Sequence, residues 1–176
     1  MDTPNPVFTE PRKCQSIMDE QQKFQSKDVS ERESAAESLS QMGSDAAPAA
    51  VELVVACGDQ ESVRQWAVAA LEEMGPPATE SIPKLTKLVS SDDPLTAYWA
   101  ITLLGRAGEA AASCQDELSA VLTDCGTTSL QERAAWALTK IGATSPKATA
   151  ALEAATSSDQ PRLARLAKTA LEQSRT

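Results

Sequence analysis

The chain has 176 residues, enough for one domain or a short array of repeats, with 41% apolar but only 3% aromatic residues. It has no histidine, the commonest general base near neutral pH and the commonest metal ligand. The net charge is −9: residues 1–126 hold 21 acidic and 9 basic residues (−12), and residues 127–176 hold 4 and 7 (+3). This balance argues against nucleic-acid binding, which depends on Lys and Arg contacts to phosphates.

Four cysteines lie far apart, without the close spacing of a metal site: Cys14, Cys57, Cys114 and Cys125. The first eleven residues are polar and proline-rich, unlike a secretory signal, and no later stretch is long enough to cross a bilayer. We therefore expect a cytoplasmic protein with reduced thiols and no membrane partner.

The apolar residues follow a helical period along almost the whole chain, and no segment shows the strict alternation of a strand. Residues 1–12 contain three prolines and are expected to form a flexible arm. A leading half-repeat is expected over residues 13–27, with one helix at about 14–25. Four repeats of two helices and a closing helix are then expected over residues 28–58, 59–91, 92–126, 127–158 and 159–173.

The expected first helices lie at about residues 30–42, 60–74, 94–107 and 128–141, and the second helices at about 46–57, 79–90, 111–124 and 146–157. Each first helix and the closing helix contain an alanine four residues before a leucine: Ala35–Leu39, Ala67–Leu71, Ala100–Leu104, Ala134–Leu138 and Ala167–Leu171. Successive leucines are 32, 33, 34 and 33 residues apart, a period typical of a solenoid of helical pairs. We interpret the alanines as points where neighbouring helices approach closely.

Turn signals separate the helices. A glycine follows each first helix, where a left-handed backbone ends a helix at low cost: Gly43, Gly75, Gly108 and Gly142. Asp59, Asp93 and Asp159 are expected to cap the helices that follow them. Together these signals predict an all-α fold, a right-handed α-α superhelix of about ten helices.

The phrase from Ser62 to Gly75 (SVRQWAVAALEEMG) resembles the short HEAT repeat, whose pattern is Val-Arg, an alanine-rich helix, leucine, a hydrophobic residue and glycine. The resemblance recurs over about residues 28–173. It implies an arginine ladder between repeats, which Ala97 and Gln131 interrupt in the third and fourth copies. It also implies that the second helices line the concave face of the array.

Positive and negative residues mix along that expected face, in the rows Glu52, Lys84, Glu117 and Ala151, and Val55, Lys87, Ala120 and Ala154. Such a face offers no continuous positive stripe to DNA. We interpret the acidic pairs at residues 72–73 and 92–93 as a solvated helix face and a helix cap, because adjacent helical residues point about 100° apart. The sequence therefore predicts no catalytic residue, no metal ligand and no cofactor.

These features favour a non-catalytic scaffold or adaptor that binds another protein, with acidic residues attracting a basic partner to the N-terminal two-thirds. The resemblance leaves two alternatives open. One is a bilin-lyase-like or other HEAT-type enzyme, and the other is a regulatory subunit of a separate enzyme.

The sharpest candidate for partner binding is a patch around Trp136, at a position that other copies fill with Glu37, Ala69, Thr102 and Thr169. Arg133 and Lys140 flank it at i−3 and i+4, and Arg162 and Arg165 of the closing helix extend it. Tryptophan and arginine are frequent binding hot spots, so the patch would hold an acidic partner or the acidic half of another copy, in weak self-association. The competing interpretation is that Trp136 packs over the neighbouring helix, while the basic residues interact favourably with the negative C-terminal end of the helix dipole.

Overall fold

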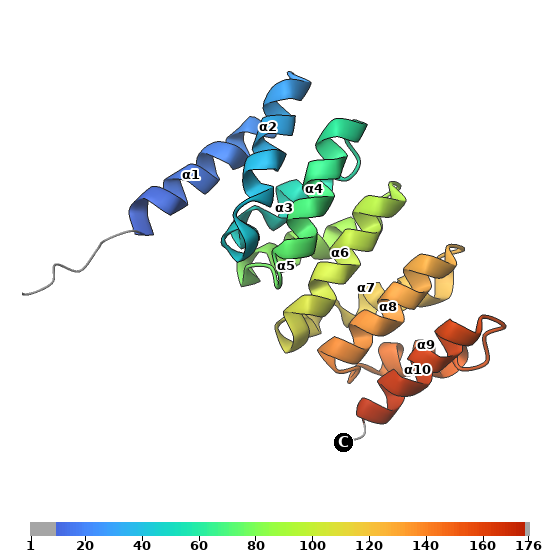
Figure 1. Cartoon of the computed structure of the whole chain (residues 1–176). Coiled ribbons are helices and arrows are strands. Elements are labelled where there is room, and N and C mark those ends of the chain that lie inside the picture. Colours follow the sequence, from blue (N-terminus) through green and yellow to red (C-terminus); the bar gives the residue numbers. More distant parts are fainter. Residues whose placement is uncertain (1–9, 175–176) are drawn as a thin grey trace, which may run out of the picture.

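The computed structural model describes residues 10–174, and side chains from residue 15 onward (Figure 1). Within these residues the chain forms ten α-helices and no strand. The first helices of the repeats are α2 (Val29–Ser40), α4 (Glu61–Glu73), α6 (Pro94–Ala107) and α8 (Thr128–Ile141). The second helices are α3 (Ala50–Ala56), α5 (Ile82–Leu88), α7 (Gln115–Asp124) and α9 (Pro146–Ala155). Helix α1 (Glu10–Lys23) precedes them and α10 (Pro161–Gln173) follows.

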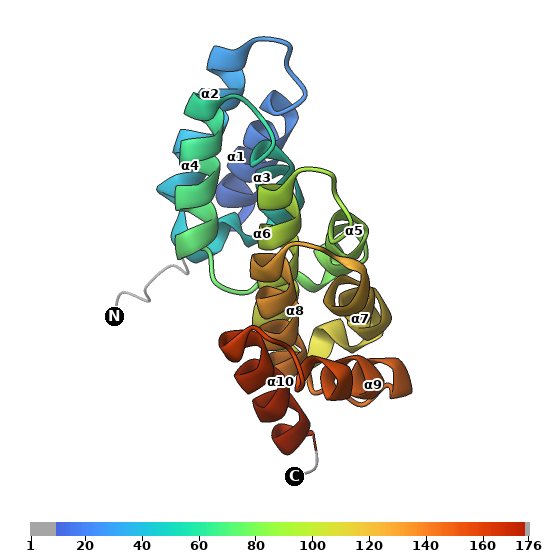
Figure 2. The same cartoon turned by 90° about the vertical axis from the view of Figure 1, so that its right-hand side faces the viewer.

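The helices form two layers (Figure 2). Helices α2, α4, α6, α8 and α10 succeed one another in one layer, and α3, α5, α7 and α9 lie beside them in the other. Helix α8 packs on α6 and α10 within its layer and on α7 across the layers. This arrangement confirms the predicted all-α solenoid of helical pairs.

The repeated alanines and leucines form the core between the layers. All five alanines of the repeated phrase are fully buried, and so are its first four leucines; Leu171, in the last helix, is half-buried. The alanines are thus core positions, as expected for residues that face a neighbouring helix. The four glycines after the first helices all have the predicted left-handed backbone, with φ between 54° and 83°.

The second helices are shorter than expected, because a 3-10 segment replaces the first turns of three of them. These segments are Gly43–Ala49, Thr79–Ser81 and Gly108–Cys114. Pro48 lies inside the first, where its missing amide removes a helical hydrogen bond. Ala111 has a non-helical backbone inside the third, with φ −94° and ψ 18°.

The expected boundaries at the N-terminus and at two caps also differ from the structure. Most of the arm expected over residues 1–12 lies outside the described residues, and Glu10–Arg12 belong to α1. Asp93 caps α6 as predicted, accepting a 2.7 Å bond from the amide of Thr96. The caps predicted at Asp59 and Asp159 are wrong, because α4 and α10 each begin one residue later, after a glutamine.

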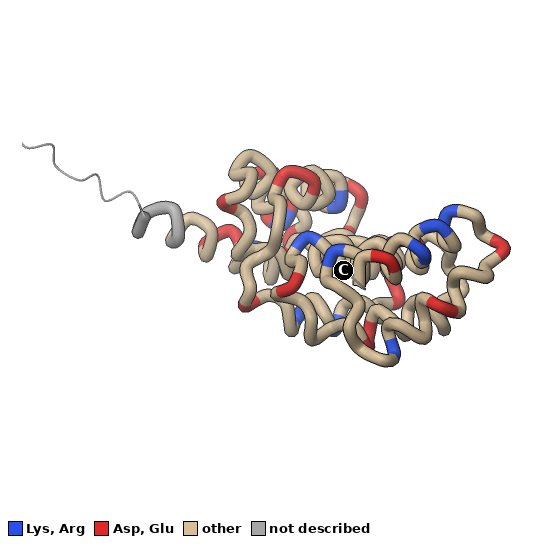
Figure 3. The backbone as a smooth tube through the Cα atoms, turned by 90° about the horizontal axis from the view of Figure 1, so that it is seen from below, with Lys and Arg blue, Asp and Glu red and all other residues tan. Residues whose placement is uncertain are grey.

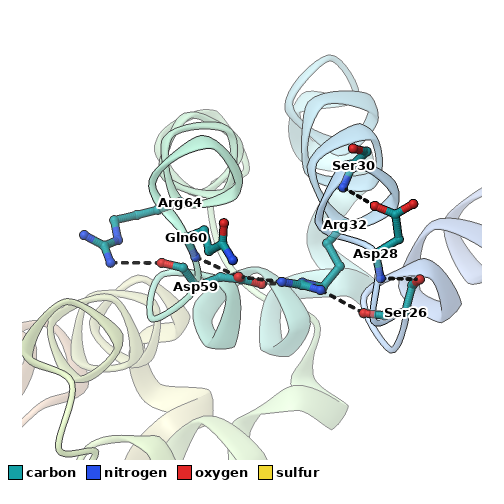
Figure 4. A network of polar contacts seen from close by, with 7 residues as sticks. All are labelled: Ser26, Asp28, Ser30, Arg32, Asp59, Gln60 and Arg64. Carbon is teal, nitrogen blue, oxygen red and sulfur yellow. Dashed lines mark hydrogen bonds and ion pairs between the residues drawn. The ribbon is translucent and has the colours of Figure 1, made fainter.

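Asp59 instead joins two neighbouring repeats (Figure 4). Its carboxylate accepts bonds of 2.6 and 2.8 Å from Nε and Nη2 of Arg32, a bidentate pair from α2 to the turn before α4. Arg64 turns toward the same loop and donates to the backbone oxygens of Cys57 and Asp59. Gln131 donates likewise to the carbonyl of Leu122, at the end of the preceding second helix. Of the residues at the implied ladder position, Arg32 binds a carboxylate of the next repeat. Arg64, in the second repeat, and Gln131, in the fourth, donate to backbone oxygens instead.

Candidate protein-binding site

The predicted patch contains a half-buried arginine between two aromatic rings. The guanidinium carbon of Arg133, on α8, lies 4.4 Å from the ring centre of Tyr98 and 5.1 Å from that of Trp136. Its Nη2 donates a hydrogen bond to the Tyr98 hydroxyl. Tyr98 comes from the neighbouring helix α6, so the two helices together hold the guanidinium by cation–π contacts.

These residues line a cavity of about 380 Å³ between α6, α8 and α10. We call it the cationic pocket and define it by its lining: Tyr98, Ser129, Glu132, Arg133, Trp136, Arg162 and Leu166. Arg162 reaches it from α10 and is held by Glu132 of α8, with 3.3 Å between Nε and Oε2. Helix α8 presents four of the seven residues because positions 129, 132, 133 and 136 fall on one helical face.

The charges of the pocket are unevenly matched. Burial lowers the pKa of Arg133, and the nearby charge of Arg162 lowers it further. A guanidinium nevertheless stays protonated at physiological pH. Among the described residues, Glu132 pairs with Arg162, whereas Arg133 has no carboxylate partner. The pocket can therefore accept one further anionic group, such as a carboxylate, at Arg133.

Lys140 and Arg165, the other two residues of the predicted patch, are exposed on α8 and α10 but do not line the cavity. They lie on the same helices as the pocket, in a part of the chain where Figure 3 shows Lys and Arg positions interspersed with Asp and Glu positions. The structure thus brings Arg133, Trp136 and Arg162 together and leaves the other two at the periphery.

Trp136 has contacts in two directions. One edge of its indole lies against Gly105 of α6, where an added Cβ would come within 2.4 Å of Cζ3. Another part lines the cationic pocket. Trp136 is therefore half-buried, and the packing role and the binding role proposed from the sequence concern different parts of one ring.

Sequence reasoning missed Tyr98 and Glu132. Tyr98 is the only tyrosine in the chain and lies 34 residues before Glu132, one repeat earlier. That spacing places both residues in the layer of the first helices. The stacking of Arg133 on Tyr98, however, depends on the offset between α6 and α8, which only the three-dimensional structure shows.

Two of the three cysteines whose side chains are described are buried, and the third is half-buried. Cys57 and Cys114 are buried, which raises the pKa of each thiol to about 12. No group of three or more His, Cys, Asp or Glu side chains converges there on a metal-sized site. None of the helices is long and apolar enough to cross a membrane, as far as the described residues reach.

Comparisons with known proteins agree with this architecture. A family model described as HEAT repeats matches residues 54–127 and 82–172. No curated protein sequence is significantly similar to the chain. An engineered protein of known structure is 20% identical, with 89% of this chain and 78% of that chain covered and a TM-score of 0.60.

The complex of CpcE and CpcF of phycocyanin lyase from Nostoc sp. PCC7120 is also similar in structure. The matched chain of that complex is 21% identical to this chain, with a TM-score of 0.59, and the match covers 99% of this chain and 70% of the matched chain. At this level of identity, both solved structures show the fold alone. The family match spans more than half of the chain and agrees with the observed helical pairs, so this protein belongs to the HEAT-repeat family.

Proposed function

We propose that this HEAT-repeat protein is a non-catalytic scaffold that binds an acidic segment of another protein at the cationic pocket. The observation that carries this proposal is Arg133: it is half-buried between two rings and lines an open cavity, and no carboxylate among the described residues pairs with it. A carboxylate from a partner would complete the arrangement that Glu132 already provides for Arg162.

The energetics favour such a contact. Two rings already fix the guanidinium of Arg133, so binding a carboxylate costs little additional side-chain entropy. Partial burial strengthens a charge-assisted hydrogen bond, and an apolar side chain of the partner can contact Trp136 and Leu166 in the same cavity. Lys140 and Arg165 would act at longer range, mainly on the rate of encounter.

The test measures the affinity of a dye-labelled peptide of alternating glutamate and leucine by fluorescence anisotropy. We expect Arg133→Gln to weaken binding about tenfold or more, because a hydrogen bond between charged groups contributes ~1.5–3 kcal/mol. Arg165→Gln removes the same charge outside the cavity and should change affinity little.

A matched peptide with glutamine in place of glutamate is the ligand control. Equal binding of the two peptides would contradict the proposal. An equal loss of affinity in both arginine variants would also contradict it, because it would reduce the effect to general attraction by the basic region.

The acidic half of a second copy is one partner of the required chemistry, since residues 1–126 have a net charge of −12. In that case the wild-type protein should self-associate weakly in sedimentation velocity at low salt, and Arg133→Gln should remove this association. If the wild-type protein remains monomeric at all concentrations, a second copy is excluded as the partner, and the acidic segment must belong to a different protein.

The lyase-like alternative is favoured by one observation, the structural similarity over 99% of this chain to the phycocyanin lyase complex. It predicts visible absorbance from a bilin after co-expression with bilin-producing enzymes. A regulatory subunit would instead copurify with a separate enzyme and change its activity. The scaffold proposal expects neither a bound chromophore nor activity of the chain alone.

A further inference from the structure

The layer formed by the second helices of the repeats contains a hollow between α5 and α7. Its volume is about 380 Å³, and its deepest residues are apolar: Val89, Val121 and Leu130, each less than 10% exposed. Helices α5 and α7 do not pack closely on each other, unlike α7 and α9. The floor of the hollow is therefore apolar, although only the edges of these buried side chains reach its surface.

Acidic side chains of α7 border the hollow. Glu117 and Asp124 are both exposed, two helical turns apart, and both line it. Neither forms an ion pair among the described residues. Lys147, from α9, is bound to Asp116 at 2.9 Å. The lining of this hollow therefore carries two carboxylates and no cation; Lys84 and Lys87, exposed on α5, lie outside the lining.

The surface continues on the other side of α7. A second hollow of about 420 Å³ lies between α7 and α9, with Ala150, Ala151 and Ala154 on its α9 side. Ala120 and Asp124 line both hollows, so α7 forms a low ridge between them. We call this surface the α7 groove and define it by α7, the two hollows and the acidic residues Glu117 and Asp124.

We propose that the α7 groove binds a basic amphipathic segment of a partner protein. An apolar side chain of the segment enters the hollow above Val121, and lysine or arginine side chains on the same segment pair with Glu117 and Asp124. The choice of occupant rests on charge complementarity: an apolar floor with unpaired carboxylates on its rim fits apolar and basic groups together. This inference extends the proposed scaffold function to a second surface, in the layer opposite the cationic pocket (Figure 2).

Cys125 provides a direct reporter, because its half-buried thiol lines the hollow. Cys57 and Cys114 are buried, and burial raises the pKa of each thiol to about 12, so neither should react in the folded protein. The side chain of Cys14 lies outside the described part of the chain, and Cys14→Ser removes it from the experiment.

The experiment measures alkylation of Cys125 by a maleimide in the full-length C14S protein. The probe is a leucine–lysine peptide of about 14 residues, roughly four helical turns. At a peptide concentration about ten times its Kd, labelling should slow about tenfold, because only the free fraction reacts. A leucine–glutamate peptide of the same length should give no protection.

Charge reversal on the rim tests the site. The variant Glu117→Lys with Asp124→Lys should weaken peptide binding about tenfold or more, since unlike charges across the interface become like charges. The matched control, Glu37→Lys with Glu73→Lys, makes the same change in net charge at exposed positions of α2 and α4 and should leave binding nearly unchanged.

A third variant fills the groove without changing charge. Ala120→Trp places a large side chain on the exposed ridge of α7 and should block the peptide, whereas Ala112→Trp, at an exposed position outside the groove, should not. Helical circular dichroism and melting curves of each variant establish that it is folded before binding is compared.

The proposal is overturned if the leucine–lysine peptide leaves Cys125 labelling unchanged, or if the two charge-reversal variants lose affinity equally. It is also overturned if folded Ala120→Trp binds as well as wild type. None of these outcomes affects the binding of the acidic peptide at Arg133. The proposals for the α7 groove and for the cationic pocket are therefore tested separately.

Discussion

Gly105 determines how closely α6 and α8 approach. Its position is buried, and a Cβ there would lie 2.4 Å from Cζ3 of Trp136 and 3.1 Å from the Cα of Ala137. Only a residue without a side chain allows the indole to lie across α6. The same contact positions Trp136 beside Arg133, so a packing residue in one helix supports the cationic pocket in the next.

We predict that Gly105→Ala destabilises the protein by about 1–3 kcal/mol, the usual cost of overpacking a core, and red-shifts the emission of Trp136. Urea unfolding and fluorescence of a protein that lacks the other two tryptophans provide the measurements. Gly126→Ala is the control, because a Cβ there meets nothing within 4 Å. Unchanged stability of Gly105→Ala would show that the two helices can separate freely.

Asp59 is the carboxylate that joins the first two repeats. The bidentate bond from Arg32 is the main cause that lowers the pKa of Asp59 below its usual value. An acid whose pKa is lower in the folded than in the unfolded protein stabilises the fold above its unfolded pKa, about 3.9 for aspartate. That stabilisation is lost as the pH falls through the folded pKa.

We therefore predict that Asp59→Asn destabilises the protein at pH 7 and that the difference from wild type narrows below about pH 4. Urea unfolding at several pH values measures this. Asp92→Asn removes the same charge at an exposed position, without breaking the contact to Arg32. A constant difference between Asp59→Asn and wild type down to pH 2 would contradict the role of this ion pair.

At the scale of helices, α10 closes the open end of the array. It packs on both α8 and α9 and buries Leu163, Ala167 and Ala170. Its outer face carries the exposed residues Arg165 and Lys168. A helix with one apolar and one polar face can cover the apolar surface of the preceding repeat and present its polar face to solvent.

Removal of the chain from Asp159 onward should lower the melting temperature and cause self-association. Both α10 and the surface it covers lose their apolar contacts, at ~25 cal/mol for each Å² of apolar area exposed. Calorimetry and sedimentation velocity measure the two effects. A chain that ends after Gln173 keeps all of α10 and should behave like wild type. A monomeric truncated protein with an unchanged melting curve would contradict the closing role of α10.

On the scale of the whole molecule, the repeats are not equally tightly joined. Helix α2 packs closely on α4, and α8 on α6 and α10, but α4 and α6 make far fewer close backbone approaches. Arg106 spans this junction: its Nη1 donates to the carbonyls of Leu71 (2.5 Å) and Gly75 (3.5 Å) at the end of α4. Its guanidinium also lies 5.6 Å from the ring centre of the buried Trp99.

In a repeat array, stability is roughly the sum of repeat and interface contributions, so a weakened junction should uncouple the two parts. We predict that Arg106→Gln speeds amide hydrogen exchange in α2 to α4 more than in α6 to α10. Lys140→Gln removes a cation from the last turn of α8 instead, where the residue is exposed, and should not produce this difference. A uniform increase in exchange over both parts would contradict the junction role of Arg106.

The cationic pocket was only partly predictable from its residues. Helical spacing alone placed Arg133 and Trp136 on one face of α8, and the composition of the closing helix suggested Arg162. The contribution of Tyr98 depends on the offset between α6 and α8, which Gly105 sets through close packing. The exclusion of Lys140 and Arg165 from the cavity likewise depends on the direction of side chains in space.

The sequence by itself determined the order and approximate positions of the helices, the left-handed glycines and the buried alanine positions. These features follow from local periodicity and backbone sterics, which repeat in every copy. The tertiary structure decided how tightly each pair of repeats packs, and therefore where hollows remain between α5 and α7 and between α6, α8 and α10. The physical reason is that these gaps depend on the bulk of facing side chains from different repeats, such as Gly105 against Trp136, and no periodic pattern within one helix specifies that pairing.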